Sequence, residues 1–386
     1  MGNCCKKKKA SESLISEEDV EKALDINESN PLGIKLKTDD FEKINLIGKG
    51  SFGEVFLVRN KVNKQYYAMK ALDKQTIITY NQEEHTKAER DLMVKVDCPF
   101  IIDIKFAFQD NQNLYLLTEF MQGGELFFHL YKEKKFKEEK AKFYLVEIIL
   151  AIEFLHKKKM MYRDLKPENI LIDKTGHIKL TDFGLSKILS KDKEKTYTIC
   201  GTPQYLAPEI LTCTGYDDSV DWWSLGCIMY KMLLGVDAFR FTKDESLSPQ
   251  KYETEIIIPD YVSKNAKDLI KKLLVVNPKK RLGSGSGGAD KIKSHPYFSD
   301  IDWEKAWNKE LEPPFVPNLE DDEDELDLKY FDKGFTSENI ETNNGSYSEE
   351  EPSSQNAIFK GFTFVNESYS KNVNEGRKSD ASSNSG

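Results

Sequence analysis

Short apolar stretches separated by polar turns make up the chain from about residue 41 to residue 120. Three of them have the length and the aromatic or β-branched content typical of strands: 41–47, 54–60 and 66–72. Two further apolar segments, 101–108 and 113–120, flank a polar turn and predict a hairpin. Residues 83–96 instead follow the spacing of a helix. This part of the chain is therefore predicted to be mainly β.

The pattern changes to helical periodicity after Gly123 and Gly124. Residues 140–156 are apolar on most sides, which predicts a long buried helix, and residues 219–234 and 265–276 predict two more. Strands in one part of the chain and helices in the next indicate an α+β protein with two lobes, joined near Met121.

Charge is distributed unevenly along the chain. Its 386 residues include 56 basic and 65 acidic residues, a net charge of −9. From Glu312 to Gly386 there are 17 acidic and 6 basic residues, or −11, so the preceding residues sum to +2. A nearly neutral body with an acidic tail lacks the basic face of a general nucleic-acid binder, so no nucleic-acid partner is expected.

Composition and pattern together predict four segments. Residues 1–40 are a polar N-terminal extension, 41–120 a small β-rich lobe, 121–298 a helical lobe, and 299–386 an extended tail rather than a third core. No apolar stretch reaches the length of about 18 residues that a spanning helix needs, and the basic start lacks the apolar region of a secretory signal. We therefore expect a cytoplasmic protein in which Cys98, Cys200, Cys213 and Cys227 are reduced thiols.

A glycine-rich sequence lies between the first two predicted strands. Gly48, Gly50 and Gly53 follow the pattern G-x-G-x-x-G, which fits an ordinary hairpin turn as well as a flap over nucleotide phosphates. Lys70, in the third predicted strand, is either an edge residue with its amine in water or a cation aimed at phosphates. In the second case Glu89, on the following helix, is the expected carboxylate partner, although a helical Glu is most often solvated.

Three further motifs follow in order. Residues 163–169 read RDLKPEN, residues 182–184 read DFG, and residues 207–209 read APE. With the glycine-rich sequence and the strand lysine, this set resembles the protein kinases. The resemblance implies a two-lobed kinase fold and transfer of the γ-phosphate of ATP to serine or threonine of a protein, with Mg²⁺ as cofactor.

The resemblance also implies roles for single residues. Asp164 would orient the substrate hydroxyl, Lys166 would lie near the γ-phosphate, and Asn169 and Asp182 would bind Mg²⁺. The expected ATP site consists of Ile47, Gly48, Gly50, Gly53, Val55, Ala68, Lys70, Glu89, Thr118, Glu119, Met121, Leu171 and Thr181. Core packing is the alternative for its apolar members. A binding-only scaffold would have lost Lys70 or one of the polar residues above, and none is lost.

Later motifs narrow the resemblance to the AGC group of kinases, closest to its Akt and ribosomal protein kinase branch. They are TICGTP at 198–203, DWWSLG at 221–226 and FKGFTF at 359–364, and the likeness spans about residues 41–365. In this group the tail is regulatory: Phe359, Phe362 and Phe364 would dock on the small lobe beside the Glu89 helix.

Regulation by phosphate follows from the same resemblance. Thr198 and Thr363 match the regulatory phosphosites of the group, which implies an upstream kinase acting on Thr198. A phosphate adds about −1.5 to −2 charge and needs a cationic cradle. Arg163, Lys187 and His85 are the residues expected to form it, although each alone fits a solvated charge.

Substrate recognition is expected to involve acidic residues. Basophilic members of the group bind arginines upstream of the phosphoacceptor, and Glu125 and Glu168 match two of the acids that they use. Gln204 and Lys231 stand where the cyclic-AMP-dependent kinase has acids. We therefore expect a preference for arginine three residues upstream and weak selection nearer the acceptor.

The N-terminus combines three signals for a membrane surface. Gly2 is a candidate for myristate, Cys4 and Cys5 are candidates for palmitate, and Lys6–Lys9 are suited to anionic lipid. Lys6 departs from the myristoylation pattern, which prefers Ser or Thr there, and a solvated basic start is the alternative. The expectation is a monomer that associates with the cytoplasmic face of a membrane through an acylated N-terminus.

Overall fold

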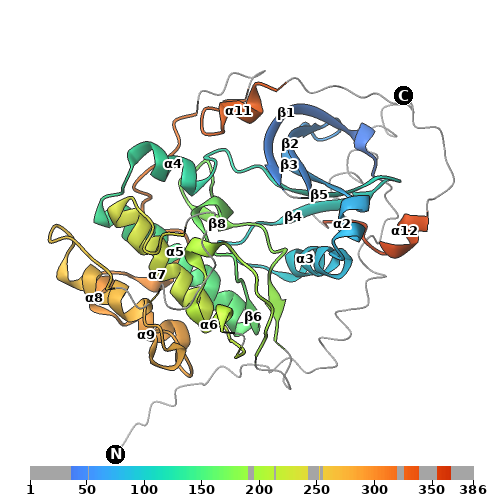
Figure 1. The fold of residues 1–386 in the computed structure, drawn as a ribbon. Coiled ribbons are helices and arrows are strands. Elements are labelled where there is room, and N and C mark those ends of the chain that lie inside the picture. The colour runs from blue at the N-terminus through green and yellow to red at the C-terminus, as the bar shows by residue number, and fades with distance from the viewer. Residues whose placement is uncertain are drawn as a thin grey trace, which may run out of the picture.

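The computed structural model describes residues 36–50, 52–189, 195–212, 214–241, 252, 255–319, 326–338 and 354–366. These residues form a small lobe built on a sheet and a larger lobe built on helices (Figure 1). The α+β, two-lobed fold predicted from the sequence is therefore confirmed. Among the described residues, no helix is long and apolar enough to cross a membrane.

The small lobe is an antiparallel sheet with the strand order β1-β2-β3-β5-β4-β10. Its strands are β1 (Phe41–Gly50), β2 (Gly53–Asn60), β3 (Tyr66–Asp73), β4 (Ile104–Gln109), β5 (Asn113–Glu119) and β10 (Phe364–Val365). The short helix η2 (Thr38–Asp40) precedes the sheet, and α2 (Lys74–Thr79) and α3 (Glu83–Lys95) follow β3. Because β1 and β2 stay paired as far as Gly50 and Gly53, the glycine-rich turn is shorter than the sequence predicts.

One face of the sheet carries an aromatic cluster. Side chains of a strand alternate between its two faces, so every second residue contributes to the cluster. Phe41 stacks on Phe108 with ring centroids 5.9 Å apart, and Phe108 stacks on Tyr115 at 4.9 Å. Tyr67 and Phe106 complete the cluster from the neighbouring strands. The opposite face is left for α3 and for the site between the lobes.

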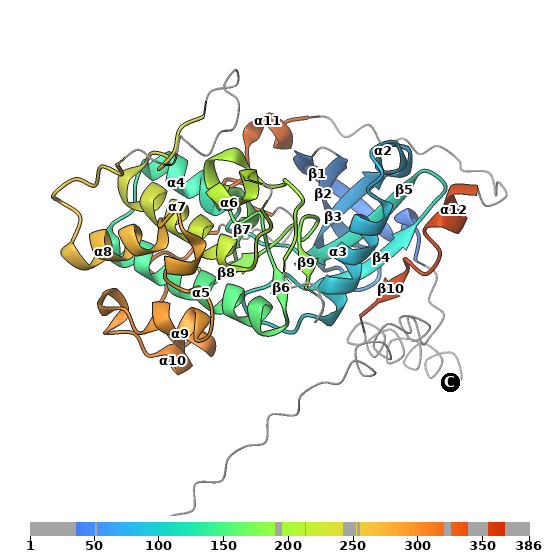
Figure 2. The ribbon, with the colours of Figure 1, turned by 60° about the horizontal axis from the view of Figure 1, so that its bottom comes forward.

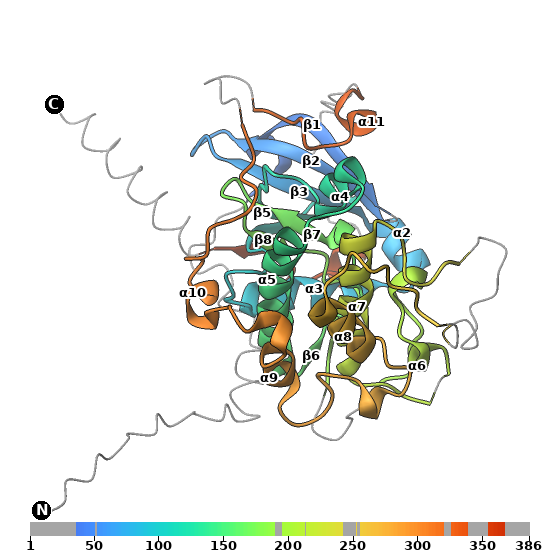
Figure 3. The ribbon, with the colours of Figure 1, turned by 90° about the vertical axis from the view of Figure 1, so that its left-hand side faces the viewer.

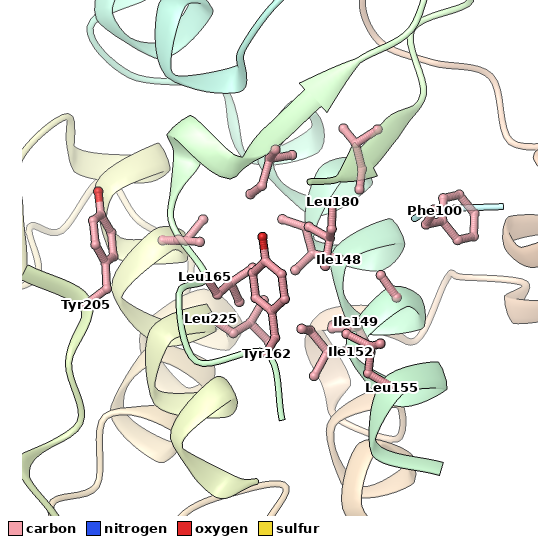
Figure 4. Packing of buried hydrophobic residues seen from close by; sticks show 14 of the residues in the cluster. Phe100, Ile148, Ile149, Ile152, Leu155, Tyr162, Leu165, Leu180, Tyr205 and Leu225 are labelled. Atoms are coloured by element: carbon pink, nitrogen blue, oxygen red, sulfur yellow. The ribbon is translucent and has the colours of Figure 1, made fainter. Parts of the chain in front are cut away.

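The large lobe is arranged around two buried helices. Its main helices are α4 (Leu126–Glu133), α5 (Glu138–Lys157), α6 (Pro208–Leu211), α7 (Ser219–Leu234), α8 (Lys264–Leu273), α9 (Gly288–Lys293) and α10 (Trp303–Trp307). Residues of α5 and Leu225 of α7 gather around Tyr162 and Leu165 (Figure 4). The three helices expected from periodicity are α5, α7 and α8, although α8 ends three residues before the expected position.

Short strands and one-turn helices lie between the longer helices of the large lobe. The strands pair as β6 (Met160–Met161) with β9 (Lys187–Ile188), and β7 (Ile170–Ile172) with β8 (Ile178–Leu180). The short 3₁₀ helices are η3 (Pro167–Asn169), η4 (Pro203–Tyr205), η6 (Pro278–Lys280) and η7 (Pro296–Phe298).

The C-terminal tail returns to the small lobe. After α10 it runs along the large lobe and reaches α11 (Lys333–Thr336) beside β1 (Figure 3). Asn45 of β1 donates to the carbonyl of Thr336 at 3.1 Å. Farther along, α12 (Ser354–Ile358) and β10 lie beside β4, where β10 extends the sheet (Figure 2). Where the structure describes it, the tail extends from the large lobe to the small lobe, and its strand β10 is added at the edge of the sheet beside β4.

Candidate active site

Lys70 joins charged residues from both lobes. Its Nζ lies 3.1 Å from Oε1 of Glu89 on α3 and 3.2 Å from Oδ1 of Asp182 in the large lobe. Because β3 lies inside the sheet, between β2 and β5, the edge-residue interpretation of Lys70 is wrong. Burial by itself would lower the pKa of Lys70, but the carboxylates of Asp182 and Glu89 outweigh it and raise that pKa. The charge of Lys70 in turn lowers the pKa of Asp182.

Asp164 is held by three side chains. Thr202 donates its hydroxyl to Oδ1 at 2.9 Å, and Lys166 Nζ lies 2.8 Å from Oδ2. Asn169 donates its amide group to Oδ2 at 3.0 Å and to the Asp164 carbonyl at 2.9 Å. Lys166 also donates to the Thr202 hydroxyl at 3.1 Å, which closes the network. The carboxylate is thereby fixed in one orientation between the two lobes.

The backbone on both sides of this network is constrained. Arg163 and Asp182 both have positive φ, of 68° and 59°, which costs about 1–3 kcal/mol for residues other than glycine. The buried carboxylate of Asp221 on α7 accepts the backbone N–H groups of Tyr162 at 3.0 Å and Arg163 at 2.8 Å. Anchoring from a buried helix therefore holds the segment that carries Asp164.

Asn169 and Asp182 have the donor chemistry that Mg²⁺ prefers, namely hard oxygen atoms. Since Asn169 uses its amide nitrogen for Asp164, its amide oxygen is the atom suited to a cation. Where the structure describes the chain, no group of three or more His, Cys, Asp or Glu residues is arranged to hold a metal ion. Oxygen atoms from bound phosphates and from water would complete the coordination of a divalent ion here.

Most of the remaining residues of the expected ATP site lie on strands, whereas Met121 follows β5 and Thr181 follows β8. Val55 pairs with Lys70 across β2 and β3, and Ala68 pairs with Thr118 across β3 and β5. Close packing explains one glycine, because a Cβ at Gly53 would lie 1.8 Å from the carbonyl oxygen of Ala71. Most of these residues are half-buried, as the walls of an open site should be, whereas Met121 is buried and Gly50 is exposed. The half-buried ones are Ile47, Gly48, Gly53, Val55, Ala68, Thr118, Glu119, Leu171 and Thr181.

The expected phosphate cradle is brought together only in part. Arg163 Nη1 donates to the Tyr216 hydroxyl at 3.3 Å, and that hydroxyl donates to the Thr198 carbonyl at 2.6 Å. Lys187 donates to the hydroxyl of Thr196 at 2.9 Å, two residues before the exposed Thr198. His85 bonds to Gln82 on its own helix at 2.8 Å. Arg163 and Lys187 thus lie beside the Thr198 segment, whereas the contact found for His85 is local.

The tail phenylalanines occupy a pocket on the small lobe. Phe359 and Phe362 are both fully buried and Phe364 is half-buried. The guanidinium of Arg90 on α3 lies 5.6 Å from the Phe362 ring centroid, and Gln109 donates to the Phe359 carbonyl at 2.9 Å. Thr363 lies between the buried Phe362 and the two-residue strand β10.

A buried lysine, which the sequence did not single out, supports the same pocket. Lys74 of α2 donates to Gln109 Oε1 at 2.8 Å, to the Asp110 carbonyl at 2.5 Å and to the side chain of Asn356 in α12. None of these acceptors is a carboxylate, so burial lowers the pKa of Lys74 to about 8. Thr202 and Asp221 belong to two of the motifs above, but their roles were not predicted, because their contacts join segments far apart along the chain.

Glu125 and Glu168 lie close enough to influence one another. Desolvation raises the pKa of Glu125 to about 7, and the like charge of Glu168 adds to this effect. One carboxylate oxygen of Glu168 is buried without a hydrogen-bond partner among the described residues. Two neighbouring carboxylates with an unsatisfied oxygen favour a cationic ligand. The lipidation candidates Gly2, Cys4 and Cys5 lie outside the described residues.

Comparison with known proteins places this geometry in a family. A model of the protein kinase domain matches residues 41–298, and a model of the protein kinase C terminal domain matches residues 323–364. The chain therefore belongs to the protein kinase family. Its resemblance to the AGC group is confirmed by the relatives described next.

Several curated proteins are similar over most of this chain. Serine/threonine-protein kinase gad8 of Schizosaccharomyces pombe is 46% identical over 312 residues, which cover 81% of this chain and 53% of that protein. Ribosomal protein S6 kinase beta of Caenorhabditis elegans is 44% identical over 357 residues, covering 90% and 63%. The RAC family serine/threonine-protein kinase homolog of Dictyostelium discoideum is 42% identical over 335 residues, covering 86% and 74%. The chain thus spans about half to three quarters of the length of these relatives.

Proposed function

We propose that this protein is a serine/threonine protein kinase that transfers the γ-phosphate of ATP to protein substrates. The observation that carries the proposal is the polar network between the lobes. Lys70 contacts Glu89 and Asp182, while Asp164 is fixed by Thr202, Lys166 and Asn169. A binding-only scaffold would not need every one of these residues in contact.

ATP and Mg²⁺ are used by protein kinases as a family. Here Lys70 is suited to the α- and β-phosphates, with the expected wall residues around the adenine. Asn169 and Asp182 are the residues that would hold Mg²⁺, which when bound neutralises charge on the transferred phosphoryl group. The positive charges of Lys70 and Lys166 complement the polyphosphate from two sides.

Asp164 would act on the substrate hydroxyl. Phosphoryl transfer has a loose transition state, so positioning and charge neutralisation contribute more than proton removal. Thr202, Lys166 and Asn169 hold the carboxylate still, so that it can accept a hydrogen bond from the serine or threonine hydroxyl and later its proton. Lys166, 2.8 Å from that carboxylate, is suited to stabilise charge on the phosphoryl oxygens.

Substrate choice would depend first on Glu125 and Glu168. Their mutual repulsion, together with the unsatisfied oxygen of Glu168, supports binding of a basic residue upstream of the phosphoacceptor. An arginine side chain fits this pair because its planar guanidinium can bond two carboxylates at once.

Regulation would involve Thr198 and Thr363. Phosphate on Thr198, added by an upstream kinase, would find Arg163 and Lys187 beside it and so order its segment. Docking of Phe359 and Phe362 beside α3 would favour the position of α3 in which Glu89 meets Lys70. The acylation signals at the N-terminus would bring this monomeric enzyme to the cytoplasmic face of a membrane.

Phosphate transfer from labelled ATP to serine peptides tests the proposal. The wild-type chain should phosphorylate a peptide with an arginine three residues upstream. Asp182→Asn should reduce kcat by about a hundredfold or more, since it removes a carboxylate aimed at the metal and phosphates. Asp327→Asn, in the tail, is a matched control that should stay active. Absence of transfer by wild type, or equal transfer by Asp182→Asn, would contradict the proposal.

A further inference from the structure

A groove opens on the large lobe between α4 and the loop that follows α7. Its volume is about 1050 Å³. It is lined by residues of α4, by the segment from Gly235 to Phe241, and by Gln204 and Lys231. None of the residues proposed above for catalysis, nucleotide binding or regulation lines it. The groove is large enough for several side chains of a bound segment.

The groove continues the surface around Asp164. Glu125 is the N-cap residue of α4, so the acidic pair stands at the start of a helix that lines the groove. Gln204 belongs to η4 and comes two residues after Thr202, which bonds directly to Asp164. A substrate segment whose basic residue reaches Glu125 and whose hydroxyl reaches Asp164 is therefore led toward the groove.

The charge of the groove is opposite to that of the acidic pair. Lys132, Lys134, Lys231 and Arg240 line it, whereas Asp237 is the single carboxylate among the described lining residues. Asp237 lies 2.8 Å from Nζ of Lys231 and so is already neutralised. Lys231 is held further by donating to the Tyr205 hydroxyl at 3.0 Å. The net positive charge thus rests mainly on Lys132, Lys134 and Arg240, which are all exposed.

Apolar surface lies between these cations. Phe127 and Tyr131 stack on one face of α4 with ring centroids 6.3 Å apart, and the Tyr131 side chain is 79% exposed. Val236, which also lines the groove, is 39% exposed. The ammonium of Lys231 lies 5.6 Å from the Phe127 ring centroid. Exposed aromatic and aliphatic residues that cluster in a groove are typical of a binding site rather than of surface that contacts only solvent.

We propose that this groove binds an anionic side chain and a neighbouring apolar side chain of the same substrate segment that places its basic residue on Glu125 and Glu168. The inference rests on the proposed kinase function and specifies the substrate class. Charge complementarity identifies the occupant: a second arginine would meet three exposed cations, whereas a carboxylate or a phosphate would meet no opposing free charge among the described lining residues. The preferred substrate segments therefore contain both a basic and an acidic residue and are not uniformly basic.

The test compares peptides that differ by one residue. The reference peptide has a phosphoacceptor serine, an arginine three residues upstream and uncharged residues elsewhere. At each remaining position in turn, the residue is then replaced by glutamate, lysine or phosphoserine. Alanine and leucine at the same position serve for comparison. KM and kcat are measured with the full chain, and peptide affinity is measured in parallel by fluorescence anisotropy. We expect KM and Kd to fall about three- to tenfold for glutamate at one or two positions, with kcat unchanged.

Variants assign the preference to the groove. Lys132→Glu combined with Arg240→Glu should remove the glutamate preference and favour lysine at the same position, while leaving the reference peptide unaffected. Lys305→Glu makes the same kind of charge change on α10, outside the groove, and should keep the wild-type preference. Phosphoserine should bind more tightly than glutamate, because it carries about −1.5 to −2 charge. A gain for phosphoserine alone would identify phosphate rather than carboxylate as the anion that is read.

Two results would overturn the inference. The first is that glutamate and phosphoserine peptides bind no better than the alanine peptide at any position. The second is that the doubly reversed variant keeps the wild-type preference. Fluorescence anisotropy measures both outcomes as peptide affinities, so neither depends on whether the peptide is phosphorylated. If no peptide is phosphorylated, the kinase proposal fails, while the binding data still support or contradict the groove.

Discussion

Asp164 shows how single side chains prepare the site for chemistry. An exposed carboxylate would rotate among several positions, but here one oxygen accepts from Thr202 and the other is engaged by Lys166 and Asn169. Thr202 is the member that does not belong to the RDLKPEN motif. It comes from a segment 38 residues away and bonds at the same time to Lys166. The Thr202 hydroxyl therefore holds Asp164 and Lys166 in a fixed position relative to one another.

Replacing Thr202 by valine should test this role. Valine keeps the shape but removes a hydrogen bond to a charged group, which contributes about 1.5–3 kcal/mol. We expect kcat to fall by about ten- to a hundredfold with little change in the KM for ATP. Thr202→Ser retains the hydroxyl and should recover most of the rate. Equal rates for the valine and serine variants would show that the hydroxyl does not position Asp164.

Glu125 predicts a pH dependence of substrate selection. Its pKa is raised to about 7, so it is ionised above that pH and becomes neutral as the pH falls through it. Attraction for an arginine is therefore present at higher pH and declines below about 7. We expect the KM for the arginine peptide to rise about three- to tenfold over about one unit on the acid side, since loss of one partly exposed charge pair is worth about 1 kcal/mol.

The matching control is a peptide with alanine in place of the arginine. Its KM should change little over the same pH range. Glu125→Gln should remove most of the pH dependence with the arginine peptide, because no carboxyl remains to titrate at that position. A pH profile for Glu125→Gln that equals the wild-type profile would assign the effect to another group.

At the scale of elements, the last strand of the sheet is supplied by the tail. β10 has only two residues, and pairing of Phe364 with Ala107 and of Val365 with Phe106 cannot hold it in place by backbone bonds alone. The buried rings of Phe359 and Phe362 and the contacts of Lys74 with Asn356 provide the rest. Docking of the tail thus depends on a few local contacts, and we expect that the tail can detach while the rest of the sheet stays folded.

Phe362→Ala should release the tail without unfolding the small lobe. Phe-to-Ala changes in a core cost about 3–5 kcal/mol, but here the loss is limited to the free energy of docking, because the tail can detach instead. Hydrogen exchange should increase in α12, β10 and β4 and stay unchanged in α5 and α7. Ile358→Ala, at a side chain that is 40% exposed, is the control and should leave exchange as in wild type. Faster exchange throughout the large lobe would contradict local release.

The elements themselves were predictable to different degrees. α7 begins and ends where the sequence predicts, because its apolar residues surround the helix and a glycine with φ of 77° ends it. α2 and α4 were not predicted, since they are short and their positions depend on packing, of α2 on β3 and of Phe128 in α4 on Tyr330 of the tail. Motif order was enough to select Asp164 and Lys70. It could not show Thr202, Lys74 or Asp221, whose contacts depend on how distant segments meet.

At the scale of the whole molecule, opposite charges are kept in separate places. The acidic pair beside Asp164 adjoins a cationic groove, and the excess of acidic over basic residues lies in the tail from Glu312 onward. Lys6–Lys9 stand at the other end of the chain. A body with a sum near +2 and a tail of −11 has no general attraction for an anionic membrane. Membrane binding would therefore depend on the N-terminal signals acting together.

Gly2→Ala should accordingly move the protein from the membrane fraction of cells to the supernatant. Without myristate the chain has no first acyl contact with the membrane, where Cys4 and Cys5 would be palmitoylated, so only the four lysines remain, at about 1 kcal/mol each near an anionic surface. Cys4→Ser with Cys5→Ser should give partial release, because myristate and the lysines remain. Raised salt should release this double variant further, since lysine attraction is screened, but should not release wild type. If Gly2→Ala partitions as wild type does, acylation at this glycine is not what holds the kinase at the membrane.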